Sequence, residues 1–255
     1  MSLTIDAIPA FTDNYIWAIR DARHCVLVDP GEASGPLAYL DRGGLTLSGV
    51  LLTHHHADHT GGVSEILAHH AAPIWGPDDP RMPAGVEVVG EGDRVVIDHP
   101  ELEFDVIETP GHTRSHIVFY GSGMLFCGDT LFSAGCGRLF EGNAGQMQRS
   151  LDKIAELPGS TRVYCAHEYT LANCRFAERV EPDNDALRRR LEQVRELRRA
   201  DRITLPTRLA EEKAFNPFLR TRAAPVIEAA RRRNPGIGNS PDEVFAAIRA
   251  WKDAG

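Results

Sequence analysis

The chain has 255 residues, of which 42% are hydrophobic and 25% charged, the composition of an ordinary globular protein with a well-buried core. Its net charge of −8 argues against a nucleic-acid backbone as the main partner. No apolar run approaches the roughly 18 residues that a membrane span needs. The N-terminus has neither the basic nor the apolar region of a signal peptide, so we expect a cytoplasmic protein without a membrane partner.

The first two thirds of the chain alternate short strands with turns. We predict strands at 15–19, 25–28, 49–52, 86–89, 94–97, 102–107, 116–120, 125–127 and 163–165, and helices at 64–68 and 146–157. Beyond about residue 168 the pattern becomes helical, with predicted helices at 171–179, 184–200, 225–233 and 241–251. The sequence therefore predicts an α/β domain over residues 1–167 and a helical domain over residues 168–255.

Five cysteines, an odd number without a CxxC spacing, predict buried reduced thiols rather than disulfides or a thiolate metal site. The histidines carry more information, because several of them gather in the segment His54-His55-His56-Ala57-Asp58-His59 directly after a predicted apolar strand. In an extended chain His54 and His56 leave on the same side, and His55 points away from them. The two imidazoles can meet one cation, while Asp58 and His59 can face a second position.

Three further candidate ligands each follow a predicted strand, where α/β folds place their sites. His112 stands after Thr109-Pro110-Gly111, Asp129 after Gly128, and His167 after the last predicted strand. The other histidines have simpler interpretations. We expect His69 and His70 to interact with a helix C-terminus, His24 and His99 to lie at the surface, and His116 to support a ligand rather than act as one.

In chain order the candidate ligands are His54, His56, Asp58, His59, His112, Asp129 and His167. This order of residue types resembles the pattern of the metallo-β-lactamase superfamily. Four stretches resemble more closely the hydroxyacylglutathione hydrolases (glyoxalase II): Thr53–His59, Gly135–Gly142, Ala166–Thr170 and Asn216–Arg220. This resemblance implies an αββα sandwich with a C-terminal helical domain. It also implies a thioester hydrolase that cleaves S-D-lactoylglutathione to glutathione and D-lactate in methylglyoxal detoxification.

The resemblance also implies the metal ligands. One divalent ion takes His54, His56 and His112; the other takes Asp58, His59 and His167; Asp129 bridges them. Zinc is expected, with iron or manganese as alternatives, and Asp58 and Asp129 are the residues expected to take part in catalysis.

The glutathione part of the substrate carries two carboxylates, and the resemblance places cations and rings around them at Arg138, Phe140, Tyr169, Arg249 and Lys252. Arg249 and Lys252 lie three apart, on one face of a predicted helix. Two departures from the family pattern stand out. Phe140 replaces a tyrosine found in some relatives, which removes a ring hydroxyl, and Arg114-Ser115 stands where relatives often have glycine.

Three other activities of the same fold stay open at this stage. A persulfide dioxygenase-like protein would hold a single iron, and a lactonase or β-lactamase would leave Arg138 and the helical tail without a role. A nuclease would need basic stretches beyond the two arginine triplets at 188–190 and 231–233, which we expect on exposed helix faces. We expect a monomer.

Overall fold

The computed structural model describes residues 3–255, which form two compact units. The first unit comprises Met1–Glu108 and Ser115–Gly128, and the second comprises Thr109–Arg114 and Asp129–Gly255. Each unit combines two segments that are separated in the sequence but pack together in the structure. The predicted domains, divided after residue 167, stay a prediction. Over residues 3–255, no helix is long and apolar enough to cross a membrane.

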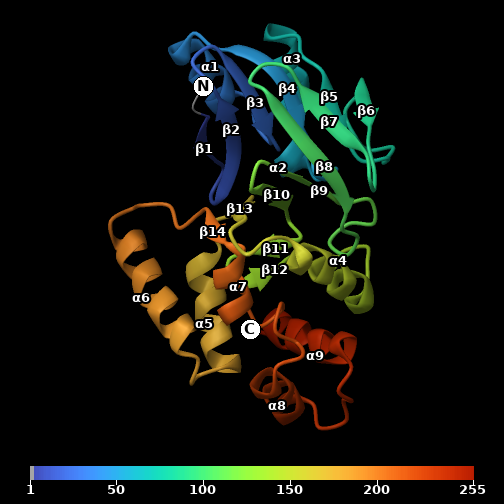
Figure 1. Cartoon of the computed structure of the whole chain (residues 1–255), viewed down its shortest axis with the longest axis vertical. Helices are drawn as coiled ribbons and strands as arrows, with labels where there is room; N and C mark the ends of the chain where they lie inside the picture. The colour runs from blue at the N-terminus through green and yellow to red at the C-terminus, as the bar shows by residue number, and fades with distance from the viewer. Residues whose placement is uncertain (1–2) are drawn as a thin grey trace. The chain divides into compact units, whose positions relative to one another are not determined.

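A six-stranded sheet opens the first unit (Figure 1). Its strands lie in chain order: β1 (Thr4–Ala10), β2 (Asn14–Arg20), β3 (His24–Val28), β4 (Thr46–Leu51), β5 (Ile74–Gly76) and β6 (Val86–Val88). The first three strands are antiparallel, and β3 to β6 are parallel. The carboxyl ends of β3 and β4 therefore share one edge, where the chain enters the histidine segment.

Helices cover one face of this sheet. Leu40 of α1 (Ser34–Gly43) and Ile66 of α3 (Val63–His69) pack with Ile16 and Leu27 in one apolar cluster. The opposite face of β2 and β3 carries Trp17, Ile19, Val26 and Val28, which are also buried. Both faces of these strands are thus covered, which explains why they read as continuous apolar runs.

Four more strands of the first unit are β7 (Arg94–Ile97), β8 (Leu102–Glu108), β9 (Ile117–Gly121) and β10 (Met124–Gly128). They pair antiparallel in chain order. Along β8, Leu102, Phe104 and Val106 are buried while Glu103 and Asp105 are exposed. This alternation with period two is typical of a sheet that packs on one face only.

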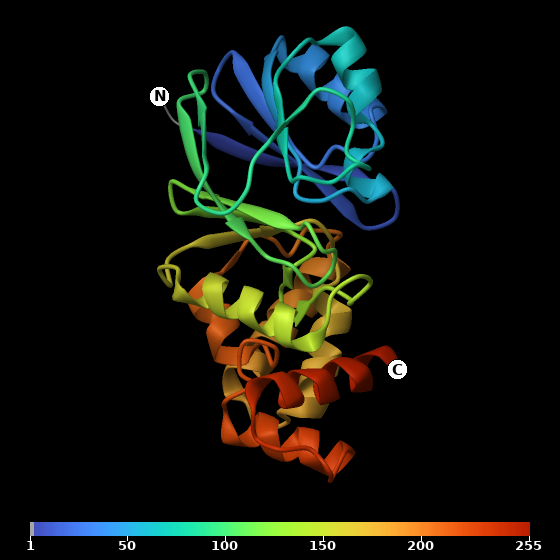
Figure 2. The same ribbon diagram turned by 90° about the vertical axis from the view of Figure 1, so that its right-hand side faces the viewer.

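The second unit is mainly helical. Its helices are α4 (Ala144–Glu156), α5 (Thr170–Val180), α6 (Asp185–Arg199), α7 (Leu209–Phe215), α8 (Ala224–Arg233) and α9 (Pro241–Asp253). The short strands β11 (Leu131–Phe132) and β12 (Gly135–Cys136) form a hairpin, and β13 (Arg162–Cys165) pairs with β14 (Thr207–Arg208). Helices α4 and α9 lie side by side (Figures 1 and 2).

Two buried polar side chains, Glu212 and Asn216, form hydrogen bonds with the β11–β12 hairpin. The buried Glu212 carboxylate accepts hydrogen bonds from the Ser133 hydroxyl and the Ala134 amide, both at 2.8 Å. The Asn216 side-chain amide donates to the Phe132 and Gly135 carbonyls at 3.0 Å each. These bonds satisfy hairpin backbone groups that would otherwise be buried without partners, and so define its conformation.

Most predicted strands and helices are confirmed, with bounds that differ by a few residues. The prediction that both arginine triplets lie on exposed faces is wrong for Arg190, which is buried and donates to the Thr204 carbonyl at 2.9 Å. Helix α6 turns this residue inward, because its buried face includes Leu187, Leu191 and Val194 at helical spacing. The five cysteines are buried and free, as predicted.

Candidate active site

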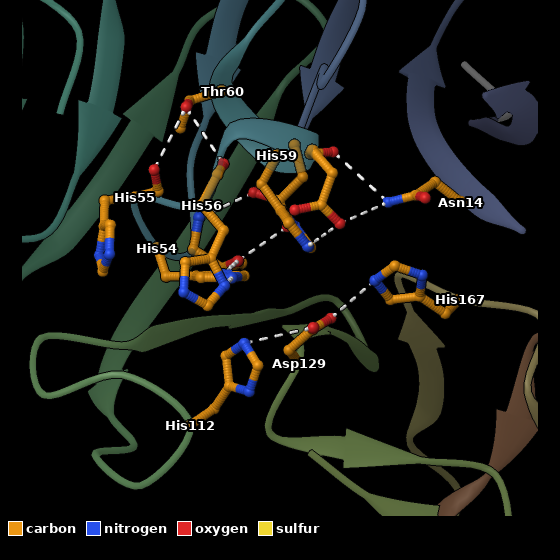
Figure 3. A network of polar contacts seen from close by, with 12 residues as sticks. Asn14, His54, His55, His56, His59, Thr60, His112, Asp129 and His167 are labelled. Carbon is orange, nitrogen blue, oxygen red and sulfur yellow. Dashed lines mark hydrogen bonds and ion pairs between the residues drawn. The ribbon is translucent and has the colours of Figure 1, made fainter. Parts of the chain in front are cut away.

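In the first unit, two histidines of the motif meet just after β4. Their nearest ring nitrogens, Nε2 of His54 and Nδ1 of His56, are 3.1 Å apart (Figure 3). His54 is fully buried. The ring of His116 stacks on that of His54 with 4.8 Å between centroids, which agrees with its predicted supporting role.

Asp29, at the end of β3, orients the histidine segment. Its Oδ2 accepts hydrogen bonds from the Thr53 hydroxyl at 2.7 Å and from His59 Nδ1 at 3.0 Å. Since the Thr53 hydroxyl gives its proton to Asp29, it accepts from His54 Nδ1, 3.1 Å away. The network therefore assigns the ring protons of His54 and His59 to Nδ1, which leaves a lone pair on each Nε2.

The sequence analysis missed Asp29. Its signal in the sequence is an acidic residue directly after the predicted strand at 25–28 and before Pro30-Gly31. The backbone of Asp29 has a φ of 52°, in the left-handed region that non-glycine residues seldom adopt. The short polar side chain of aspartate tolerates this conformation better than an apolar one would.

Asp58 lies in the one-turn helix α2 (Ala57–Thr60), and its Oδ2 is 3.5 Å from His59 Nε2. The Asn14 side-chain amide donates to the same oxygen at 3.0 Å (Figure 3). Glycine is required at Gly31, because a β-carbon there would lie 1.9 Å from the Asp58 carbonyl oxygen. Neither contact is visible in the sequence, because both join segments far apart in the chain.

In the second unit, one carboxylate contacts two histidines. Asp129 follows β10, and its Oδ2 lies 3.3 Å from His112 Nε2 while its Oδ1 lies 3.3 Å from His167 Nε2 (Figure 3). His112 Nδ1 donates to the Arg138 carbonyl at 2.9 Å, so its Nε2 carries the lone pair. Gly137 allows this arrangement, because a β-carbon there would lie 1.9 Å from the Asp129 carbonyl oxygen.

The donor atoms in each unit fit a divalent metal ion. Two atoms bound to one zinc ion at about 2.0–2.2 Å in a tetrahedral arrangement lie roughly 3.4 Å apart. The four pairs measured above, each within one unit, are separated by 3.1–3.5 Å. Neutral imidazole and carboxylate are also the ligand types that zinc, iron and manganese share. The types and spacings of these histidine and aspartate atoms therefore fit a divalent-metal site.

A pocket of about 480 Å³ lies in the second unit beside these ligands. The predicted ligands His112 and Asp129 line it, together with all five predicted substrate-binding residues. The full lining consists of His112, Asp129, Phe132, Cys136, Arg138, Phe140, Tyr169, Ala172, Asn173, Arg249 and Lys252. Residues from five segments of the chain thus meet in one cavity.

The cations of the pocket differ in their surroundings. Arg249 is buried, and two of its nitrogens donate to Asp253, at 2.7 and 3.3 Å, while Nη1 donates to the Cys136 carbonyl at 3.2 Å. Lys252 contacts the Asn173 side-chain carbonyl, and burial, followed by the nearby Arg249 charge, lowers its pKa to about 8. The sequence analysis missed both Asp253 and Asn173, which hold the two cations in place.

Aromatic rings flank the histidines of the second unit. Tyr169 stacks on His167, with 4.7 Å between centroids, and Phe140 meets His112 edge-on at 5.2 Å. Phe132 lies edge-on to both His167 and Tyr169. Phe140 is 64% exposed and presents an apolar ring at the pocket, where a tyrosine would add a hydroxyl. These rings restrict the orientation of the two imidazoles.

Of the remaining histidines, His55 and His69 lie as predicted and His99 is exposed as predicted, whereas His24 is half-buried instead of lying fully at the surface. The Nδ1 atom of His55 lies 3.5 Å from the Asp79 carboxylate, so the His55 ring turns toward Asp79. His69 Nδ1 contacts the Glu65 carbonyl near the end of α3, at 2.9 Å. His24 and His99 stack on each other with 5.1 Å between their centroids.

Comparison with known proteins agrees with this geometry. Residues 10–167 match the model of the metallo-beta-lactamase superfamily, and residues 168–255 match the model of the hydroxyacylglutathione hydrolase C-terminus. The crystal structure of ETHE1 from Myxococcus xanthus covers 100% of both chains with a TM-score of 0.66 and 27% identity. A protein solved in a di-iron-bound form is 26% identical with a TM-score of 0.55, over 64% of this chain and 91% of its own. The fold and the histidine motif thus define a metallo-β-lactamase superfamily protein with a C-terminal helical region, as predicted.

Sequence similarity identifies the family within this class. The hydroxyacylglutathione hydrolase of Pseudomonas fluorescens (strain SBW25) is 49% identical over 254 residues, which cover 98% of this chain and 99% of that protein. The chain belongs to the hydroxyacylglutathione hydrolase family, and it is an enzyme of the hydrolase class. The resemblance noted in the sequence is therefore confirmed.

Proposed function

We propose that the protein hydrolyses S-D-lactoylglutathione to glutathione and D-lactate, the thioester hydrolysis of methylglyoxal detoxification. The observation that carries this proposal is the pocket of the second unit, which joins the ligands His112 and Asp129 to the cations Arg138, Arg249 and Lys252. A substrate with a thioester at one end and carboxylates at the other matches this distribution of groups. The name of the relatives that match the whole chain supports the same substrate.

For the cofactor we propose two divalent ions, zinc in the first place, with iron or manganese as alternatives. One ion would take His54, His56 and His112, the other Asp58, His59 and His167, and Asp129 would bridge them. The bridging role is supported by the two Asp129 oxygens, each of which accompanies a different histidine. The di-iron-bound relative supports the number of ions. When bound, such a pair of metals supplies a nucleophilic hydroxide at neutral pH and polarises the thioester carbonyl.

The residues of the chain bind and orient the substrate. Lys252 and Arg138 offer charges to the glutathione carboxylates, and the Arg249 guanidinium, already paired with Asp253, holds the backbone of Cys136 at the pocket wall. The rings of Tyr169 and Phe140 lie against the proposed ligands His167 and His112 and limit the directions from which the substrate can reach them. Asp29 holds His54 and His59 in the tautomer that metal binding requires.

The rival activities of the fold are less well supported. A persulfide dioxygenase-like protein, a lactonase or a nuclease would not account for the match of residues 168–255 to the hydroxyacylglutathione hydrolase C-terminus. A monomeric state and a cytoplasmic location stay predictions.

The first experiment measures thiol release from S-D-lactoylglutathione with and without a chelator, together with metal analysis of the same sample. We expect chelator-sensitive turnover and about two metal ions per chain. A fully metallated, folded sample that released no thiol would overturn the substrate assignment. Oxygen uptake with a persulfide would then favour a mononuclear iron oxidoreductase, and turnover of a lactone panel would favour a lactonase.

A further inference from the structure

A side-chain amide outside the histidine motif contacts Asp58. Asn14 is the first residue of β2 and is buried. Its Nδ2 donates to Asp58 Oδ2 at 3.0 Å and to the Asp58 backbone carbonyl at 3.4 Å (Figure 3). One amide group, with two N–H bonds, thus holds the backbone and the carboxylate of the same residue.

The Asp58 side chain is more exposed than that of its neighbour His59 and lies on a very short helix. It is 42% exposed, whereas that of His59 is 1% exposed. Helix α2 is a single turn, and the Gly62 amide donates to the Pro30 carbonyl instead of extending the helical bonds to Asp58. A half-exposed carboxylate on so short a helix retains several rotamers unless a neighbour selects one.

The position that Asn14 selects has a chemical consequence. The Asp58 oxygen that accepts from Asn14 is the one 3.5 Å from His59 Nε2, within the range expected of two ligand atoms on one ion. A carboxylate oxygen has a second lone pair, so it can accept this hydrogen bond and bind a metal. We propose that Asn14 is a positioning residue for Asp58, which sets the affinity of the metal ion shared by Asp58 and His59. This inference rests on the proposed function, which takes Asp58 as a ligand.

The direct test is the Asn14→Ala variant, studied by titration of the metal-loaded protein with a chromophoric chelator. We expect the affinity for one of the two ions to fall about 10–100-fold, because loss of an outer hydrogen bond to a ligand has effects of this size. The affinity for the other ion should stay within about twofold of that of the unaltered protein. The turnover number should fall, while KM for the thioester should change little, because Asn14 does not line the substrate pocket.

Two further variants separate positioning from simple destabilisation. Asn14→Leu keeps the size of the side chain but removes the donor without adding a charge, so it should weaken the same ion as much as Asn14→Ala does. Tyr39→Phe removes a hydroxyl that bonds to Asp6 of β1, on the same hairpin but away from the motif, and should leave metal affinity unchanged. On an Asp58→Ala background, Asn14→Ala should change metal affinity by less than about twofold, since the effect acts through Asp58.

The outcomes distinguish this inference from the function on which it rests. If the unaltered protein binds two ions and Asn14→Ala retains both with unchanged affinity, Asn14 has no positioning role, although the proposed function stands. If the unaltered protein binds no pair of ions, both proposals fall. Should Asn14→Ala not fold, as judged by its circular dichroism, the titration of Asn14→Leu decides in its place.

Discussion

At the scale of single residues, the site depends on neighbours that hold its functional groups. Asp29 accepts from Thr53 and His59 through one oxygen, and in this way determines the tautomers of two histidines. In the pocket, burial, followed by the nearby Arg249 charge, lowers the pKa of Lys252 to about 8. Above this lowered pKa the Lys252 side chain is a neutral amine, at a pH where an exposed lysine would still be protonated.

This lysine leads to a prediction of pH dependence. The Lys252 pKa is about 8, so the charged form that attracts a substrate carboxylate is present below this pH and is lost above it. We expect kcat/KM for the glutathione thioester to fall by about tenfold per pH unit on the alkaline side. Lys252→Arg should abolish this fall, because a guanidinium stays protonated. A pH profile of Lys252→Arg that matched the original one would assign the titration to another group.

At the scale of elements, strands and amphipathic helices were predicted where their patterns were strong, as in β8 and α6. Strand β1 was missed because Asp6 and Pro9 disfavour a strand, although an edge position tolerates both. Helix α1 was missed because it contains Gly35, Pro36 and Gly43 and has no side-chain cap, so packing of Leu40 stabilises it instead. The β11–β12 hairpin is too short to carry a pattern, and buried polar contacts define it.

Those polar contacts predict the effect of removing Glu212. Its carboxylate is fully buried, which raises its pKa, and it accepts from Ser133, Ala134 and Asn216. Glu212→Ala should lower the free energy of unfolding by about 3 kcal/mol, because buried donors lose their acceptor. Denaturant unfolding measures this loss, and Glu211→Ala, on an exposed neighbour, is the matched control. Equal stability of the two variants would show that the carboxylate is dispensable to the hairpin.

At the scale of the whole molecule, the proposed metal ligands come from segments of the chain spread between His54 and His167. The unfolded chain cannot assemble such a set, so bound metal stabilises the folded state. At a free metal concentration of about 100 times the dissociation constant this contributes about 2.7 kcal/mol per ion.

Metal removal should therefore change thermal stability. We expect the midpoint of unfolding to fall by about 10–20 °C when a chelator removes both ions, and to recover when zinc is added back. Differential scanning calorimetry measures the change. Asp129→Ala should show little response to chelator, whereas His69→Ala, outside the ligand set, should respond like the unaltered protein. An unfolding midpoint that stayed the same in the presence of the chelator would contradict the proposal that the folded chain binds these ions.

The sequence by itself determined the family and the types and order of the candidate ligands, because the preference of a metal for imidazole and carboxylate depends on residue type and local spacing. It also indicated the strand ends that carry the ligands. Only the tertiary structure decided which residues support them: Asn14 reaches Asp58 across 44 positions, and Asp29 reaches His59 across 30. Such contacts depend on how strands pack side by side, and no periodicity along the chain records that packing.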